Sequence, residues 1–188
     1  MQSNRLRVKI YAVEGRPLER FIPVFHRFIR EKVFDELAID VADYGHVVEG
    51  PGVALIGHAY DYYWDLGEGR PGLVYTRKRE PRPPAERLGH AVRELVRAAR
   101  LLESDAELGG LQFKTDELLV QALDRLHAPP TDSGFALLRA ELDDFGNKLY
   151  LGAPIAVERT GEARDALAAR LTVTDAHPTL AELAARLG

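Results

Sequence analysis

Three side chains near residue 50 belong to the types that bind a divalent transition metal. His46 and Glu49 form an H-x-x-E element, and His58 follows shortly after them. Neutral imidazole and carboxylate ligands together suit Zn²⁺ or a related ion, which would activate a water molecule for hydrolysis. Asp43 would then orient one histidine or act as the base. The competing interpretation is a loop whose polar side chains bind its own backbone, because the flanking glycines argue against the helix that would give this spacing its geometry.

The same stretch contains a glycine-rich loop over residues 45–58. Gly50 and Gly52 flank Pro51 in this loop. Glycine lets a ligand approach the backbone closely, and successive backbone N–H groups can bind an anion. The usual phosphate-binding patterns place a helix after the glycines, whereas the residues after Gly52 predict a strand. The loop is therefore either a tight turn or one wall of a small-ligand pocket.

Aromatic residues alternate along the stretch that follows, which we expect to form an aromatic hairpin over residues 58–75. On a strand, alternate side chains point to the same face of the sheet. A row of aromatic rings can stack on a ligand, form a dimer interface or pack in the core, and core or interface packing is the interpretation that we favour. The residues that share this face by strand parity are Ala54, Ile56, His58, Tyr60, Tyr62 and Trp64.

A basic run follows the hairpin at residues 77–79. Charged side chains commonly protect the edge of a sheet from pairing with other chains. Arg77 could instead bind an anionic ligand, or form a cross-strand pair with Asp61. We include Arg77 among the candidate ligand-binding residues with Gly50 and Gly52. The remaining candidates are His58, Tyr60, Tyr62 and Trp64.

The elements that must position these residues follow from the spacing of apolar side chains. Alternation over residues 6–12 predicts a strand, and helical spacing predicts helices over 18–29 and 84–103. His90 and His127 are expected to face solvent. Further expected strands span 37–41, 53–66, 73–79, 111–114, 153–159 and 170–174, and further helices begin near Ser133 and Pro178.

The apolar run at residues 118–126 is ambiguous. Its spacing favours a helix with Thr115 or Asp116 near the N-cap. A strand over residues 116–127 remains the alternative.

The mixture of helices with several antiparallel strand pairs predicts the fold class. We expect an α+β fold, in which a mostly antiparallel mixed sheet has helices packed on it. The length suits a single compact domain over residues 1–188. The proline cluster at residues 81–84 is the candidate for an internal break.

Composition limits the classes of partner. The formal net charge of −4 gives no general reason to expect nucleic acid. The absence of cysteine excludes disulfides and thiolate metal sites. No apolar run is long enough to span a membrane, and the start of the chain lacks the pattern of a signal peptide. We therefore expect a cytoplasmic protein.

Two functions of different classes follow from these residues. The first is a binding or assembly module, with a small-molecule ligand in the pocket formed by loop 45–58 and hairpin 58–75, or with a second copy of the chain as a homodimer partner. The second is a metal-dependent hydrolase that uses His46, Glu49 and His58 as ligands of a divalent metal. We favour the first, because the sequence contains no complete catalytic motif.

Overall fold

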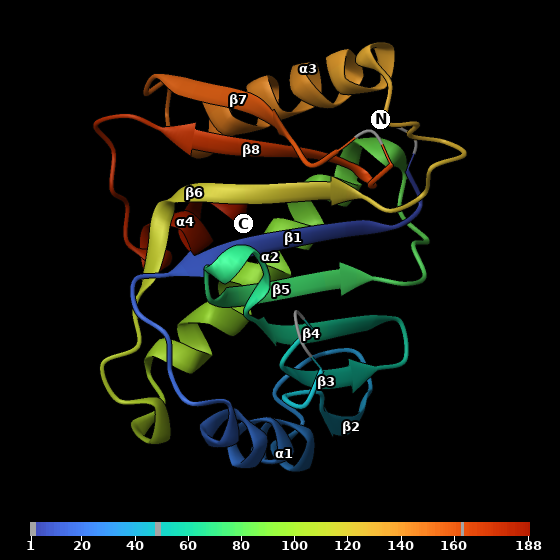
Figure 1. Ribbon diagram of the computed structural model, residues 1–188. Helices are drawn as coiled ribbons and strands as arrows, with labels where there is room; N and C mark the ends of the chain where they lie inside the picture. Colours follow the sequence, from blue (N-terminus) through green and yellow to red (C-terminus); the bar gives the residue numbers. More distant parts are fainter. Residues whose placement is uncertain (1–2, 48–49, 163) are drawn as a thin grey trace.

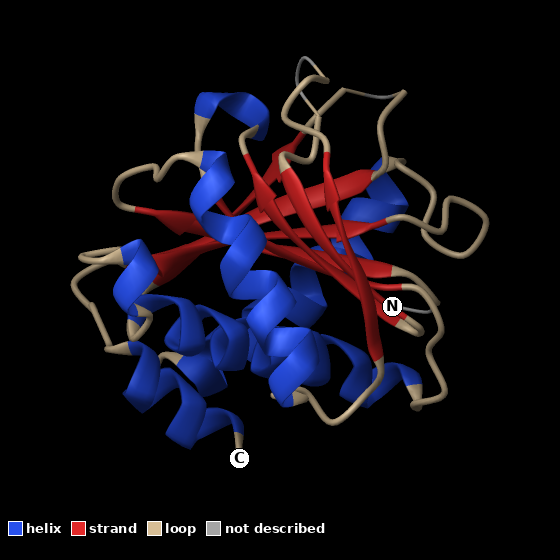
Figure 2. Cartoon of the chain, turned by 90° about the horizontal axis from the view of Figure 1, so that it is seen from below, coloured by secondary structure: helices blue, strands red, loops and turns tan. Residues whose placement is uncertain are grey.

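The chain folds into one antiparallel sheet with helices on one side (Figures 1 and 2). The computed structural model describes residues 3–47, 50–162 and 164–188. The strand order is β2-β3-β4-β5-β1-β6-β8-β7, and each neighbouring pair is antiparallel. This arrangement confirms the predicted α+β fold. The strands are β1 (Leu6–Ala12), β2 (Ala38–Asp43), β3 (Val53–Gly57), β4 (Tyr60–Asp65), β5 (Gly72–Arg77), β6 (Phe113–Ala122), β7 (Ile155–Thr160) and β8 (Leu167–Val173).

Four α-helices lie within the described residues, and most helical segments gather on one side of the strands (Figure 2). The longest, α2, crosses the middle of the sheet and contacts β1 and β5, while α4 packs on α2. At one end of the sheet α1 contacts β2 and β3, and at the other α3 contacts β7 and β8. We call the side that carries these helices the covered face. The helices are α1 (Phe21–Glu31), α2 (Pro84–Glu103), α3 (Asp132–Leu149) and α4 (Leu180–Leu187).

The central strand β1 explains why the two faces differ. Its Val8 and Ile10 are fully buried in the core beneath the helices. Because side chains alternate along a strand, Arg7, Lys9 and Tyr11 point to the opposite side, which we call the open face. The short 3-10 turn η2 (Gly67–Gly69) lies in front of this face (Figure 1).

The predicted helix over 118–126 is wrong, because residues 113–122 form strand β6. Leu118 and Val120 are buried in the core of the covered face, while Leu119 is buried against Tyr11 on the open face. A central strand that is apolar on both sides lacks the alternation that identifies a half-buried strand. Its continuous apolar run therefore resembled the spacing of a helix.

The stretch predicted as a single strand over 53–66 is a hairpin of two strands, β3 and β4. The chain reverses at His58 and Ala59, so the parity that holds along one strand does not continue into the next. Val53 pairs with Trp64, and both lie in the core of the covered face. The aromatic row therefore shares its face with the apolar residues Val53 and Leu55, whereas Ala54 and Ile56 belong to the opposite side.

Side-chain caps fix the starts of the last two helices. The N-cap of α3 is Thr131 rather than Ser133, and its hydroxyl accepts a hydrogen bond from the backbone N–H of Gly134. Thr179 and Glu182 form a reciprocal capping box at the start of α4. Within the described residues, no helix has both the length and the apolar character needed to cross a membrane.

Candidate functional site

The two histidines predicted to share a metal lie beyond opposite ends of β3. His46 is in the loop that precedes this strand, and His58 follows its last residue. Five residues of extended chain separate the two ends by roughly 16 Å. Glu49 lies outside the described residues. Within the described part of the chain, no group of three His, Cys, Asp or Glu side chains is placed to hold a metal ion.

The residues of the glycine-rich loop have clear structural contacts. The Asp43 carboxylate accepts a hydrogen bond of 2.8 Å from the backbone N–H of Gly45, the kind of bond that shapes an Asx turn. Gly52 adopts a φ of +64°, and a Cβ there would stand 2.2 Å from the backbone oxygen of Trp64. Glycine is therefore required at position 52 for packing. A ligand-binding role for Gly50 and Gly52 stays a prediction.

The aromatic row is part of the protein's own core. Trp64 has an exposed fraction of 0 % and stacks on Phe21 of α1, with ring centroids 4.1 Å apart. The Tyr62 hydroxyl donates to the backbone oxygen of Glu94 in α2 at 3.1 Å. Both rings are covered by helices of the same chain, which favours the core interpretation over a surface for a ligand or a second copy.

Arg77 and Asp61, expected to pair across the hairpin, point to opposite faces. Arg77 lies opposite Tyr60 on the covered face, where its guanidinium is 2.6 Å from the Glu36 carboxylate. Asp61 pairs with Lys78 at 2.7 Å instead. The alternative of an Arg77–Asp61 pair is therefore wrong. His58 is exposed and accepts a hydrogen bond of 2.9 Å from Arg79.

A groove of about 350 Å³ lies on the open face and includes parts of both predicted segments. Pro51 of the glycine-rich loop stands at one side, and η2 of the hairpin stands at another. The strand register brings the remaining side chains together across the centre of the sheet: Lys9 lies between Val74 and Leu119, and Val74 faces Tyr63. The residues that line this open-face groove are Arg7, Lys9, Pro51, Tyr63, Asp65, Gly67, Glu68, Val74, Leu119 and Gln121.

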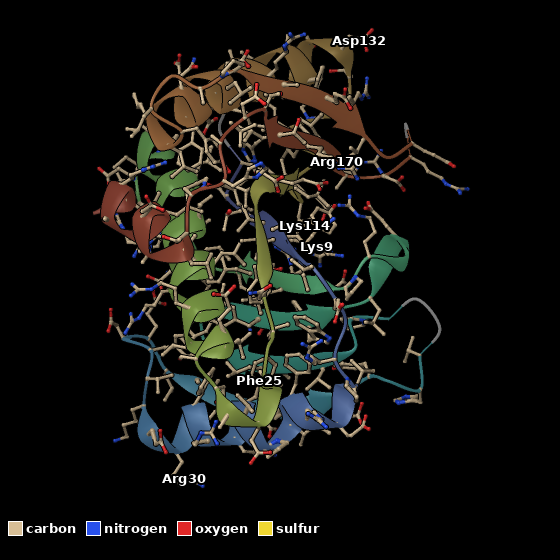
Figure 3. The ribbon with its side chains drawn as sticks, turned by 90° about the vertical axis from the view of Figure 1, so that its left-hand side faces the viewer. Lys9, Phe25, Arg30, Lys114, Asp132 and Arg170 are labelled. Carbon is tan, nitrogen blue, oxygen red and sulfur yellow. The ribbon has the colours of Figure 1, made fainter. Side chains whose placement is uncertain are left out.

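Lys9 forms the most enclosed charge of the groove. It has an exposed fraction of 3 %, and its ammonium lies 2.6 Å from the Asp65 carboxylate and 3.2 Å from the backbone oxygen of Gly67. Figure 3 views the sheet from its side and shows Lys9 and Arg170 on neighbouring parts of it. Because Asp65 and Gly67 satisfy the ammonium, Lys9 contributes little net charge to an incoming ligand.

A network of ion pairs around Tyr11 borders the groove. Arg70 stacks on the Tyr11 ring at 3.7 Å and forms two hydrogen bonds of 2.7 and 2.6 Å with Glu117. Arg170 contacts Glu117 at 3.0 Å and Glu68 at 3.3 Å. Burial alone would raise the pKa of Glu117, but the hydrogen bonds from Arg70 lower that pKa below its ordinary value. The charges of this network therefore neutralise one another.

Arg7 differs from these cations because, among the described residues, no carboxylate forms an ion pair with it. Its Nε donates to the Thr76 hydroxyl at 3.2 Å. The half-buried Tyr63 ring lies nearby, and burial, together with the neighbouring Asp61, raises the pKa of Tyr63 to about 12. The groove thus combines one guanidinium without a counter-charge and an apolar floor. This combination can bind a small molecule that carries an anionic group.

Sequence reasoning did not identify Arg7 and Lys9 as site residues. Their alternation with apolar residues indicated only the solvent side of a strand. The groove depends on which strands flank β1, and the register with β5 and β6 is a property of the whole sheet. No protein-family model matches this sequence, and no curated protein matches it either.

Proposed function

We propose that this protein is a binding module for a small organic anion, which it takes up in the open-face groove. The observation that carries the proposal is the half-buried guanidinium of Arg7, which has a hydrogen bond to Thr76 but no ion pair among the described residues. An anionic group of the ligand would supply the missing counter-charge. An apolar or aromatic body would lie on Val74, Leu119 and the Tyr63 ring.

The geometry of the groove limits the ligand to a small one. A volume of about 350 Å³ lies near the lower end of the usual range for small-molecule pockets. Gln121 adds a neutral amide beside Arg7, since the two are register partners in β1 and β6. The neighbouring Lys9–Asp65 pair is internally neutral and would orient polar atoms of the ligand.

The metal-dependent hydrolase has weaker support, because His46 and His58 lie beyond opposite ends of β3. Self-association through the aromatic row also has weaker support, because the rings of Tyr62 and Trp64 are buried. Ligand binding in the groove requires neither that the two histidines come together nor that the buried rings become exposed. It is therefore the function that we favour.

Calorimetric titration with benzoate, inorganic phosphate and the neutral analogue benzyl alcohol tests this proposal. We expect benzoate to bind more tightly than benzyl alcohol. Arg7→Gln should weaken benzoate binding by roughly tenfold to a hundredfold, as expected for the loss of a charge-assisted hydrogen bond. The matched control Arg30→Gln removes an exposed guanidinium on α1, and its pair with Glu31 lies far from the groove.

We expect Arg7→Gln to reduce the affinity for benzoate more than it reduces the stability of the fold. Arg7→Gln breaks no ion pair within the described residues and loses only the hydrogen bond to Thr76, so we expect its free energy of unfolding to fall by about 1 kcal/mol. Equal benzoate affinity in wild type, Arg7→Gln and Arg30→Gln would contradict the proposal. Failure of both anions to bind wild-type protein would contradict it as well.

A further inference from the structure

A second cavity lies on the covered face, between α2 and the segment that joins α1 to β2. Its volume is about 190 Å³, and we call it the α2 cavity. Phe34, Tyr60 and Tyr75 supply aromatic walls, while His90 and Glu94 reach it from α2. His90 and Glu94 are four residues apart in this helix, so they lie on the same face of it.

His90 carries an unused hydrogen-bonding atom into the cavity. This residue has an exposed fraction of only 8 %, and its Nε2 is buried without a hydrogen-bond partner in the described part of the protein. Burial and, secondly, the positive charges of Arg82 and Arg77 lower the pKa of His90 to about 4. The ring is therefore neutral at pH 7 and has one nitrogen free to accept a hydrogen bond. A buried polar atom of this kind is stabilised by a ligand that satisfies it.

Glu94 is the carboxyl group around the cavity that lacks a counter-charge. Among the described residues, no cation forms an ion pair with it, although the three neighbouring arginines are each paired with another carboxylate. Burial raises the pKa of Glu94, and the positive charge of Arg97 opposes this effect only in part. The neighbouring ion pairs join Arg97 to Asp35 at 3.0 Å, Arg77 to Glu36 at 2.6 Å and Arg82 to Glu80 at 3.2 Å.

The aromatic walls favour a cation beside Glu94. The rings of Tyr60 and Tyr75 stack with centroids 6.0 Å apart, and Phe34 meets Tyr60 edge to face at the same distance. The Tyr60 hydroxyl is already used, because it donates to the backbone oxygen of Glu36 at 3.0 Å. Aromatic rings attract an ammonium group through their negative faces, and they repel a carboxylate.

We propose that the α2 cavity binds a small aliphatic primary amine as its ammonium ion. The Glu94 carboxylate is the counter-ion, and His90 Nε2 accepts one of the ammonium N–H bonds. The rings of Phe34, Tyr60 and Tyr75 enclose the alkyl chain. This site is on the opposite side of the sheet from the open-face groove and takes a ligand of opposite charge, so it does not rest on the anion-binding function.

Histidine NMR of the wild-type protein provides the first test, with n-propylamine as the probe at pH 7. The resonance of His90 Nε2 is assigned by its loss in His90→Gln. We expect n-propylamine to shift this resonance toward the value of a hydrogen-bonded nitrogen, with saturation. The uncharged n-propanol and the anion propionate should give no saturable shift. Absence of a shift with n-propylamine, or saturable binding of propionate instead, would overturn the proposal.

A pair of matched variants on α2 provides the second test. Glu94→Gln removes the counter-ion while retaining the shape of the side chain, and we expect n-propylamine affinity to fall about tenfold or more. Glu86→Gln makes the same chemical change at an exposed position in the first turn of α2 and should leave affinity unchanged. Equal affinities in the two variants would contradict the role of Glu94. If Glu94→Gln does not fold, the NMR titration of the wild-type protein with n-propylamine, n-propanol and propionate decides whether the proposal stands.

Discussion

The two faces of the sheet place their polar groups in different ways. On the open face, Lys9 comes from β1 itself and Arg70 from the loop just before β5, and they pair with Asp65 of β4 and Glu117 of β6. On the covered face, the strands contribute tyrosines, Trp64 and Arg77 of β5, while His90 and Glu94 reach the sheet from α2. Among the described residues, Arg7 in the open-face groove thus has no ion pair, whereas in the α2 cavity Glu94 has no ion pair and His90 Nε2 has no hydrogen bond.

This difference is the basis of the two sites that we propose on opposite sides of the sheet. Adjacent residues of β1 point to opposite sides of the sheet. Arg7 therefore faces the open-face groove, while its neighbour Val8 is fully buried on the covered face. Substitutions on the covered face should act mainly on folding, because they remove packing. Substitutions on the open face should act mainly on charge balance and binding.

Adjacent residues of β4 give the largest expected contrast. Trp64→Ala removes a fully buried side chain from the covered face and should lower the free energy of unfolding by about 3–5 kcal/mol. Tyr63→Ala, on the open face, should lower it by about 1 kcal/mol. Urea unfolding at pH 7 measures both. Losses of equal size would mean that the two faces are not energetically distinct.

Acid should destabilise the covered face through His90. Its folded-state pKa of about 4 lies below the ordinary value of 6.5, so the unfolded chain binds a proton first as the pH falls. The stability that comes from a neutral His90 is therefore complete above pH 6.5 and is lost as the pH falls toward 4. The loss should reach about 3 kcal/mol.

The variant His90→Gln separates this contribution from those of other titrating groups. Its free energy of unfolding should fall less steeply than that of wild type between pH 6.5 and 4. The other charged groups near His90, including Glu36, Glu80 and Glu94, are present in both proteins, so their contributions largely cancel in the comparison. Parallel curves for the two proteins would show that His90 does not control the acid response.

On the open face, Asp65→Asn should leave the buried ammonium of Lys9 without its counter-charge. We expect a loss of about 2 kcal/mol, below the usual range for a buried pair because the Asp65 side chain is partly exposed. The double variant Lys9→Met with Asp65→Asn should recover part of this loss, because it also removes the unpaired charge. A double variant no more stable than Asp65→Asn alone would indicate that packing by Lys9 matters more than its charge. Thermal and urea unfolding provide the measurements.

The sequence predicts the elements whose apolar residues recur on one side. Strand β1 alternates apolar with polar side chains and helix α2 repeats its apolar residues at helical spacing, so the periodicity identifies both directly. Strand β6 is buried on both faces, which explains why its apolar run resembled a helix. The prediction of one strand over residues 53–66 was wrong, because the chain reverses there to form β3 and β4 and the reversal at His58 has no strong turn motif.

The candidate sites were harder to predict for a related reason. His90 was expected to face solvent, yet it is buried, because the segment containing Phe34 packs beside α2 and encloses it. Arg7 is a candidate site residue only because β5 and β6 flank β1 with a particular register. Contacts between distant segments decide both positions, and a single sequence contains no local signal for them.

The central position of β1 has a consequence for the order of events during synthesis. Within this sheet β1 is synthesised before its neighbours, so it must wait for β5 and then for β6, whose last residue is Ala122, before both of its edges are paired. Until then Val8 and Ile10 have no core to enter, and the strand offers two unpaired edges. The nascent chain should therefore depend on chaperones, or on rapid translation through residue 122, more than a chain whose first strand lies at the margin of its sheet.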